Sequence, residues 1–253
     1  MNWGTLLLHQ KIAIEGPRLT SEFPDFLNKI KVKEIIRTRA PAARVARLIR
    51  VFRDPVEFTA DDINPAHILK ASRGSGLLAD IATIGTPEAA RAEMQKWIGE
   101  LARINKPPEF LIEEKIQDAV FGLTGTATDY KFFCFGGEPK FFLCRFLSAD
   151  GKWNRNFYDL DYQPIKLEGG KELPRIDLGP MLEIAKKLSA SFPFVRIDLY
   201  NSAEGVYFGE YTFHVNGGYR EFDAKTELRL GGFWLEPPSA GVSPQNPPPE
   251  QKL

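Results

Sequence analysis

The chain has 253 residues, 43% of them hydrophobic and 26% charged, so it is long enough to bury a full core in one large domain or two small lobes. No apolar run reaches the ~18 residues needed to cross a bilayer, which argues against a membrane-spanning helix. The formal net charge is zero, but the charge is unevenly distributed along the chain.

Two features predict a cytoplasmic protein. The apolar run Thr5–Leu8 is too short for the core of a signal peptide, and no cationic leader precedes it. The only two cysteines, Cys134 and Cys144, flank a turn that would not place them opposite each other, so we expect reduced thiols rather than a disulfide.

The segment from Lys29 to Arg53 carries nine basic residues and one acidic residue. Apolar residues recur at roughly helical spacing from Phe23 to Phe52, and Pro41 divides them into two expected helices. Arginines three apart would form a stripe on the second helix. This stripe is either a solvated face or a docking surface for anionic lipid or a polyanionic glycan. Nucleic acid is not expected, because neither interleaved aromatic residues nor a recognised motif is present.

A glycine-rich loop follows a short expected strand at residues 65–71. Glycines let backbone N–H groups approach phosphates, and Lys70, just upstream, could reach the same phosphates as a point charge. The loop does not match a P-loop, and by itself it is more typical of an ordinary turn.

The middle of the chain alternates expected helices and strands. Thr86-Pro87-Glu88 is a helix start, and the helix should run to about Ile104. A buried strand at residues 110–112 leads to an aromatic hairpin at residues 129–146. Residues 149–176 are polar and punctuated, which predicts an irregular insert or connecting loop.

The stretch from Phe192 to His214 has two alternating runs around a polar turn, which is typical of a β-hairpin. With the turn near Ala203, Asp198 lies opposite or diagonal to Glu210, and Arg196 lies on the same patch. The patch is either an ordinary surface cluster of charges or a magnesium site, since a hard divalent cation removes the repulsion between two neighbouring carboxylates.

The order of these parts resembles the ATP-grasp superfamily, and most closely its TupA-like branch, which is linked to teichuronopeptide and other surface-polysaccharide synthesis. The resemblance covers roughly residues 62–232. It rests on the stretches HILKASRGSG, FLIEEKI, DYKFFCFGGEPKFF, FPFVRIDLY and VYFGEYTFHVNGG. It implies an α+β fold of two lobes that grip ATP, preceded by a short helical N-terminal region.

The resemblance also implies a role for individual residues. Asp198 and Glu210 match the magnesium-binding acids, and Arg196 matches the arginine that faces the transferred phosphate. Two positions depart from the usual pattern: Arg73 replaces a histidine before the glycines, and Thr212 stands where many ATP-grasp ligases have asparagine. The residues implied to bind ATP are Lys70, Arg73, Gly74, Ser75, Gly76, Glu113, Glu114, Ile116 and Lys131.

These inferences together predict a magnesium- and ATP-dependent carboxylate–amine ligase in cell-surface polysaccharide synthesis, acting on a carboxylate-bearing sugar or amino acid. The alternatives are an ATP-dependent kinase of a hydroxyl group and a non-catalytic nucleotide-binding subunit. The expected organisation is a basic N-terminal region (1–61), an ATP-grasp domain (62–235) and a disordered proline-rich tail (236–253). We expect a cytoplasmic protein that can attach to the inner face of the membrane through Lys29–Arg53.

Overall fold

The computed structural model describes residues 2–120, 127–148 and 150–235. Contacts between residues divide the chain into two compact units. Unit 1 comprises the described residues of the ranges 1–23, 129–199 and 209–253, and unit 2 comprises 24–128 and 200–208. The predicted disordered tail lies outside the described residues, and the predicted boundary after residue 61 stays a prediction.

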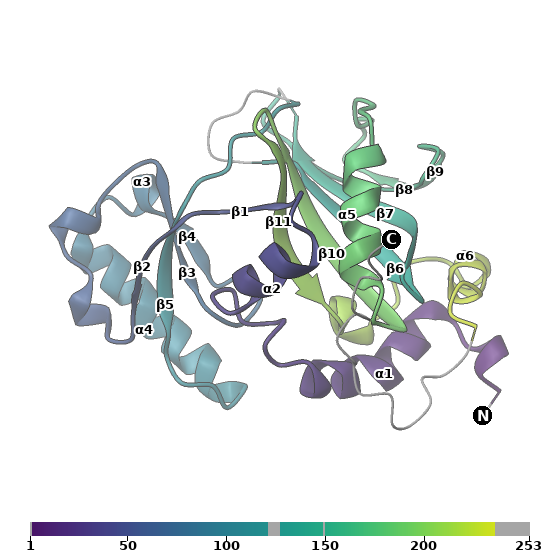
Figure 1. Cartoon of the computed structure of the whole chain (residues 1–253), viewed down its shortest axis with the longest axis horizontal. Coiled ribbons are helices and arrows are strands. Elements are labelled where there is room, and N and C mark those ends of the chain that lie inside the picture. Colours follow the sequence, from purple (N-terminus) through teal and green to yellow (C-terminus); the bar gives the residue numbers. More distant parts are fainter. Residues whose placement is uncertain (1, 121–126, 149, 236–253) are drawn as a thin grey trace, which may run out of the picture. The chain divides into compact units, whose positions relative to one another are not determined.

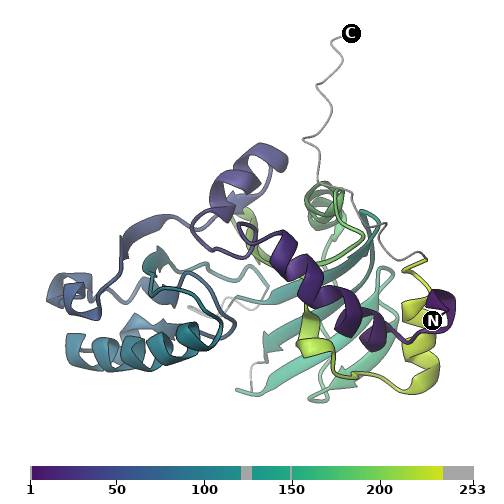
Figure 2. The same ribbon diagram turned by 90° about the horizontal axis from the view of Figure 1, so that it is seen from below.

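Unit 2 is built on a four-stranded antiparallel sheet in the order β2-β5-β3-β4 (Figure 1). Its strands are β2 (Leu48–Phe52), β3 (His67–Ala71), β4 (Leu78–Asp80) and β5 (Phe110–Glu114). Helix α4 (Pro87–Arg103) lies along one face of the sheet (Figure 2) and packs Met94 and Trp97 against the strands. The remaining elements are α2 (Val32–Arg39), β1 (Arg44–Val45), α3 (Ile81–Ile84) and the 3₁₀ turns η2 (Pro55–Glu57) and η3 (Ala60–Asp62).

The prediction of a helix after Pro41 is wrong, because this segment forms strands β1 and β2 instead. Strand β2 pairs with β5, and Phe52 is the only one of its five residues that is buried. Val45, Ile49 and Val51 are β-branched residues that suit a pleated surface, and backbone pairing overrides the weak helical spacing. The arginine stripe therefore does not exist as a helix face.

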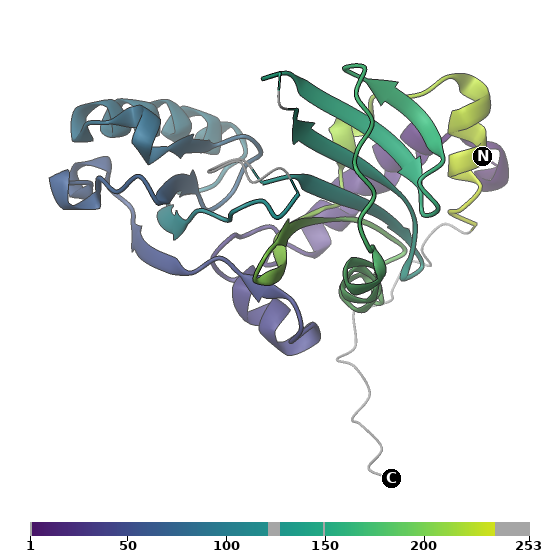
Figure 3. The same ribbon diagram turned by 90° about the horizontal axis from the view of Figure 1, so that it is seen from above.

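Unit 1 carries strands of a mixed seven-stranded sheet in the order β1-β11-β10-β6-β7-β8-β9, whose end strand β1 belongs to unit 2. Helix α5 (Gly179–Ser189) packs on β6 and β7 (Figure 3), while α1 (Leu8–Glu22) contacts α6 (Ala224–Gly231) and the 3₁₀ turn η4 (Val215–Gly218). A further 3₁₀ turn, η1, spans Trp3–Thr5. The strands are β6 (Asp129–Phe135), β7 (Glu138–Leu147), β8 (Trp153–Asp159), β9 (Pro164–Glu168), β10 (Phe194–Ser202) and β11 (Gly205–Thr212).

The prediction of an irregular segment at residues 149–176 is also wrong, because this range contains strands β8 and β9. The sequence pattern did not indicate these strands, because hydrophilic residues, Asn154 and Asn156, occupy buried positions where apolar residues are expected. Each amide bonds to nearby main-chain groups, so the cost of burying it is compensated. The hairpin predicted at residues 192–214 is confirmed by β10 and β11, which are joined at Ala203-Glu204.

Strands β6 to β9 present two different faces. On one face the ring of Phe142 packs at a tilt against the rings of Tyr130 and Phe132. On the other face lie Asp129 and Lys131, since successive side chains of a strand alternate. The charged residues of unit 1 described below come from this second face.

Candidate functional site

Arg196 on β10 is the centre of a charged cluster in unit 1. Its Nε and Nη2 donate to the two carboxylate oxygens of Asp198 at 2.7 and 2.8 Å, a bidentate pair. Nη2 also donates to Glu210 Oε1 at 3.1 Å and to the Thr212 hydroxyl at 3.0 Å. The hairpin therefore brings together the arginine and both acids that the sequence singled out.

Lys131 on β6 joins this cluster from the neighbouring strand. Its Nζ lies 2.6 Å from Asp198 Oδ2 and 2.7 Å from Asp129 Oδ2. Burial alone would lower the pKa of Lys131, but the charges of Asp198 and Asp129 outweigh it and raise that pKa. Burial would likewise raise the pKa of Asp198, yet Arg196 and Lys131 lower it, so Asp198 is held as a carboxylate. We call Asp129, Lys131, Arg196, Asp198, Glu210 and Thr212 the Asp198 cluster.

The Asp198 cluster has an incomplete set of partners. Asp129 Oδ1 is buried and makes no hydrogen bond, and burial raises the pKa of this carboxyl group. Three carboxylates face two cations, which leaves a formal charge of −1. A hard divalent cation prefers oxygen ligands and compensates negative charge, so the donor set fits magnesium.

The described residues contain no group of three or more His, Cys, Asp or Glu side chains placed to hold a metal ion. Glu210 is the more accessible of the two predicted ligands, with 34% of its side chain exposed against 1% for Asp198.

A second charged cluster lies in unit 2 around Glu113 on β5. The Glu113 carboxylate is 3% exposed and accepts from Lys70 at 2.8 Å and from Lys33 at 2.7 Å. Burial would raise the pKa of Glu113, but the two lysines outweigh it and lower the pKa. We call Lys33, Lys70 and Glu113 the Glu113 cluster, and its formal charge is +1.

The glycine-rich loop follows β3 in unit 2. Gly74 and Gly76 have φ angles of +85° and +74°, which only glycine adopts without strain. The main-chain carbonyl of Gly74 accepts from Lys29 Nζ at 2.9 Å, and Arg73 donates to the carbonyl of Pro24 at 2.8 Å. Arg73 thus binds main chain in this structure, and Ser75 is exposed.

The other predicted nucleotide contacts lie just after Glu113. Glu114 accepts from the Arg47 main-chain N–H at 2.8 Å and lies 3.4 Å from its guanidinium. Ile116 is half-buried. The structure therefore holds Glu114 through Arg47, the residue that precedes β2.

A family model described as TupA-like ATPgrasp matches residues 90–235, more than half of the chain. The chain belongs to the TupA-like ATP-grasp family. This membership confirms the resemblance and the mixed α+β, ATP-grasp fold expected from the sequence. None of the proteins of curated function matches the chain.

Solved structures of ATP-grasp proteins are distantly similar to this family member. A RimK domain ATP-grasp protein from Sphaerobacter thermophilus is 10% identical, covering 83% of this chain and 65% of its own, with a TM-score of 0.48. D-alanine–D-alanine ligase from Bacillus anthracis complexed with ATP is 13% identical, covering 83% and 64%, with a TM-score of 0.49. The ATP-grasp ligase PsnB complexed with minimal precursor, Mg and ADP is 11% identical, covering 85% and 59%, with a TM-score of 0.44. The chain spans less than two thirds of each of these proteins.

The sequence did not indicate two residues that belong to the Asp198 and Glu113 clusters of this protein. Asp129 was noted only as the start of a hairpin, although an acid two residues before a lysine on one strand face signals a pair. Lys33 lies far from Glu113 in sequence, and it is 7% exposed because Val32 and Ile36 bring that side of α2 into the core. Only the tertiary structure reveals it.

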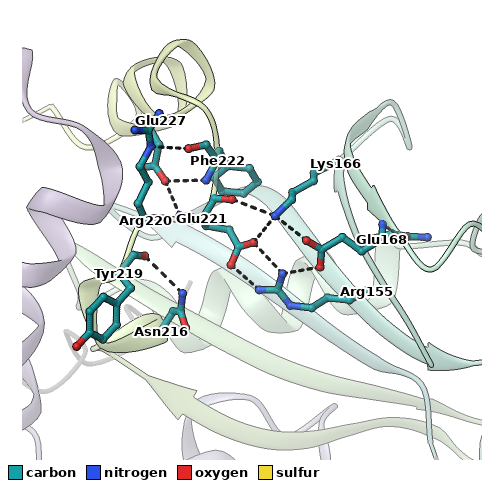
Figure 4. A network of polar contacts seen from close by, with 10 residues as sticks. Arg155, Lys166, Glu168, Asn216, Tyr219, Arg220, Glu221, Phe222 and Glu227 are labelled. Atoms are coloured by element: carbon teal, nitrogen blue, oxygen red, sulfur yellow. Dashed lines mark hydrogen bonds and ion pairs between the residues drawn. The ribbon is translucent and has the colours of Figure 1, made fainter. Parts of the chain in front are cut away.

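Another polar network occupies the same unit as the Asp198 cluster (Figure 4). Arg155 on β8 makes a bidentate pair with Glu221 at 2.6 and 2.8 Å, and it also bonds Glu168 at 3.0 Å. Lys166 on β9 lies 2.6 Å from Glu168 and 2.8 Å from Glu221. Two cations and two acids therefore balance each other in this network.

Proposed function

We propose that this protein is a magnesium-dependent ATP-grasp ligase that joins a carboxylate to an amine. The observation that carries the proposal is the Asp198 cluster: three acids, one of them buried and two partly buried, with one formal negative charge in excess and one buried oxygen without a hydrogen bond, beside a bidentate arginine. A buried charge imbalance of this kind is costly unless a ligand completes it. Magnesium–ATP supplies both the cation and the phosphate oxygens that would do so.

Each residue of the cluster has a distinct part in the proposal. Asp198 and Glu210 would hold magnesium, which when bound neutralises the charge of the phosphate oxygens. Arg196 would face the transferred phosphoryl group, because its Nη2 already binds both magnesium-site acids. Lys131 would bind phosphate from the adjacent strand, and its raised pKa keeps it protonated at neutral pH.

The proposed reaction has two steps. An oxygen of the substrate carboxylate attacks the γ-phosphorus of ATP, the bond to the β-phosphate oxygen breaks, and ADP leaves. An amine then attacks the acyl carbon, the bond from that carbon to the phosphate oxygen breaks, and phosphate leaves with formation of the amide. The residues of the cluster act by positioning and charge stabilisation, which supply most of the catalysis in phosphoryl transfer.

Nucleotide binding in unit 2 is assigned by the same proposal to Lys70, the glycine-rich loop from Arg73 to Gly76, and the segment from Glu113 to Ile116. The +1 charge of the Glu113 cluster supports it, since phosphate oxygens are attracted to a surplus of lysine. Lys70→Ala should weaken ATP binding. The matched control is Lys96→Ala, which removes an exposed lysine on α4 that pairs only with Glu93.

Purified protein tests the proposal directly. We expect ATP binding that depends on magnesium, and ADP release that depends on a carboxylate acceptor and an amine. Product analysis separates the two reaction classes: an amide with free phosphate identifies the ligase, while a stable phosphorylated hydroxyl identifies the kinase. Absence of both ATP binding and ADP release would refute the proposal, whereas ATP binding without ADP release would favour a non-catalytic nucleotide-binding subunit.

The finer setting of the proposal is cell-surface polysaccharide synthesis in the cytoplasm, with an acceptor that is a carboxylate-bearing sugar or amino acid. No helix among the described residues is long and apolar enough to span a membrane. The proposed peripheral contact involves the segment Lys29–Arg53, in which five arginines each lie within 4 Å of an acid; these pairs are Arg37–Glu34, Arg44–Glu204, Arg47–Glu114, Arg50–Asp62 and Arg53–Glu109.

Because those acids compensate much of the basic charge, we expect only weak attachment to anionic membranes, further reduced by salt. Co-sedimentation with liposomes containing phosphatidylserine measures it. Binding that is equal at low and high salt would contradict an electrostatic contact.

A further inference from the structure

One row of charged residues crosses four strands of the unit 1 sheet. Directly opposite residues pair Asp129 with Arg145, Arg145 with Arg155, and Arg155 with Glu168. Opposite residues of antiparallel strands point to the same face, so all four side chains share the face that carries Lys131. The Asp198 cluster and the Arg155 network therefore lie on one face, and Arg145 lies between them.

Arg145 and Arg155 are like charges placed directly opposite each other, which is destabilising in a sheet unless the charge is compensated. Arg155 is compensated by Glu221 and Glu168, as Figure 4 shows. Arg145 has no carboxylate within 4 Å among the residues that the structure describes, and it is exposed. The positive charge of Arg145 is therefore available to an anionic ligand, whereas that of Arg155 is compensated.

Arg145 is nevertheless held in place. Its guanidinium carbon lies 4.2 Å from the ring centroid of Trp153, a cation–π contact at the start of β8. Stacking on an indole fixes the plane of the guanidinium and leaves its N–H groups at the edge available to an acceptor of hydrogen bonds. The contact with Trp153 therefore orders a guanidinium that is otherwise exposed.

The site lies on the same sheet as the proposed reaction centre. Neighbouring strands are about 4.8 Å apart, so β7, which carries Arg145, lies one strand from Asp129 on β6, two strands (~10 Å) from Asp198 on β10 and three strands (~14 Å) from Glu210 on β11. An acceptor anchored at Arg145 and long enough to span this separation would reach the acids and Arg196 with another of its groups.

We propose that Arg145, stacked on Trp153, binds an oxyanion of the acceptor, either a carboxylate or a phosphate ester, and so selects an anionic acceptor. The proposal rests on the proposed ligase function. Arg145 would bind the anion through charge-assisted hydrogen bonds.

The test uses the whole protein with magnesium and a non-hydrolysable ATP analogue, and three probes: D-glucuronate, D-glucose 6-phosphate and D-glucose. Ligand-observed NMR titration measures the affinity of each probe. The variant is Arg145→Gln. The matched control is Arg175→Gln, which removes another exposed arginine stacked on an aromatic ring, Tyr162, whose own ring packs on Phe142 of the opposite sheet face.

We expect the wild type to bind at least one anionic hexose and to bind glucose much more weakly. Arg145→Gln should lose about tenfold or more of the anion affinity, while its affinity for the ATP analogue stays unchanged. The stronger of the two anionic probes identifies the oxyanion as carboxylate or phosphate. Arg175→Gln should behave as the wild type.

The inference is overturned if the wild type binds the ATP analogue but neither anionic hexose, if glucose binds equally well, or if Arg145→Gln binds the anions as tightly as the wild type. An equal loss in Arg175→Gln would also overturn it, since any exposed arginine would then have the same effect. Failure of the wild type to bind the ATP analogue is a separate result that refutes the proposed function instead.

Discussion

Replacing Lys33 with methionine tests whether the Glu113 cluster is both a structural element and a source of positive charge. Lys33 Nζ lies 2.7 Å from Glu113, and both side chains are less than a tenth exposed. At an effective dielectric of about 20, two unit charges at that distance attract by about 6 kcal/mol. The net loss of folding free energy is smaller than this attraction, because the variant no longer has to bury the ammonium group. Removing one partner of a buried ion pair typically costs about 3–5 kcal/mol of stability.

Because Lys70 still pairs with Glu113, we expect the Lys33→Met variant to lose about 3 kcal/mol, the lower end of that range. This corresponds to a fall of about 6–12 °C in Tm for a chain of this size. The formal charge of the cluster also falls from +1 to 0. The affinity for ATP should therefore fall, while the affinity for adenosine, which has no phosphate, should not change.

Thermal melting followed by circular dichroism and calorimetric titration with ATP and adenosine provide the two measurements. Lys31→Met is the matched control, since Lys31 lies two residues away and pairs with Asp25 on the surface, where more than half of both side chains is exposed. Such pairs contribute about 0–1 kcal/mol. If Lys33→Met and Lys31→Met melt at the same temperature, the reasoning about burial is wrong. If the affinities for ATP and adenosine fall together, Lys33 has no effect through charge.

Three further predictions concern single positions. Glu210→Gln should reduce turnover about a hundredfold or more with little change in Tm, because a partly exposed magnesium ligand is lost, and retained turnover would contradict its role. The pKa of Glu113 is lower in the folded protein than the ordinary 4.5, so the stabilisation from ionised Glu113 is present above that pH and is lost as the pH falls through the folded-state pKa. Glu113→Gln should therefore flatten the acid side of a curve of Tm against pH. An unchanged slope would contradict this. Gly218→Ala should lower stability by about 2–4 kcal/mol in urea unfolding, since φ is +74° and the new Cβ would lie 2.7 Å from Ala13, whereas Gly151→Ala, with similar φ and open space, isolates the strain alone and should lose less.

Local signals were enough to predict the elements that depend on near neighbours in the chain. The helix at residues 87–103 begins where Thr86 accepts from the Ala89 main-chain N–H, as the capping pattern indicated. The β10–β11 hairpin follows from alternation around a short polar turn. Arg196, Asp198 and Glu210 could therefore be grouped from the sequence, because a hairpin places them within reach of one another.

Elements whose character depends on distant partners could not be predicted in the same way. Strand β2 is half exposed and acquires its conformation by pairing with β5, about sixty residues later, so its local pattern was ambiguous between helix and strand. Strand β8 buries two asparagines that form hydrogen bonds with the main chain of Lys171, in the segment after β9. Lys33 and Glu113 lie eighty residues apart and meet only through tertiary packing.

The two clusters differ in the sign of their uncompensated charge, and the difference is specific to the proposed ligand. The Asp198 cluster, with three carboxylates to two cations, suits a metal ion, and the Glu113 cluster, with two lysines to one carboxylate, suits phosphate oxygens. A purely structural ion-pair network tends toward balance, as in the Arg155 network, where two cations meet two acids. Burial makes an imbalance costly, so its presence at both sites argues that each is completed by a ligand. Magnesium–ATP carries both of the missing charges.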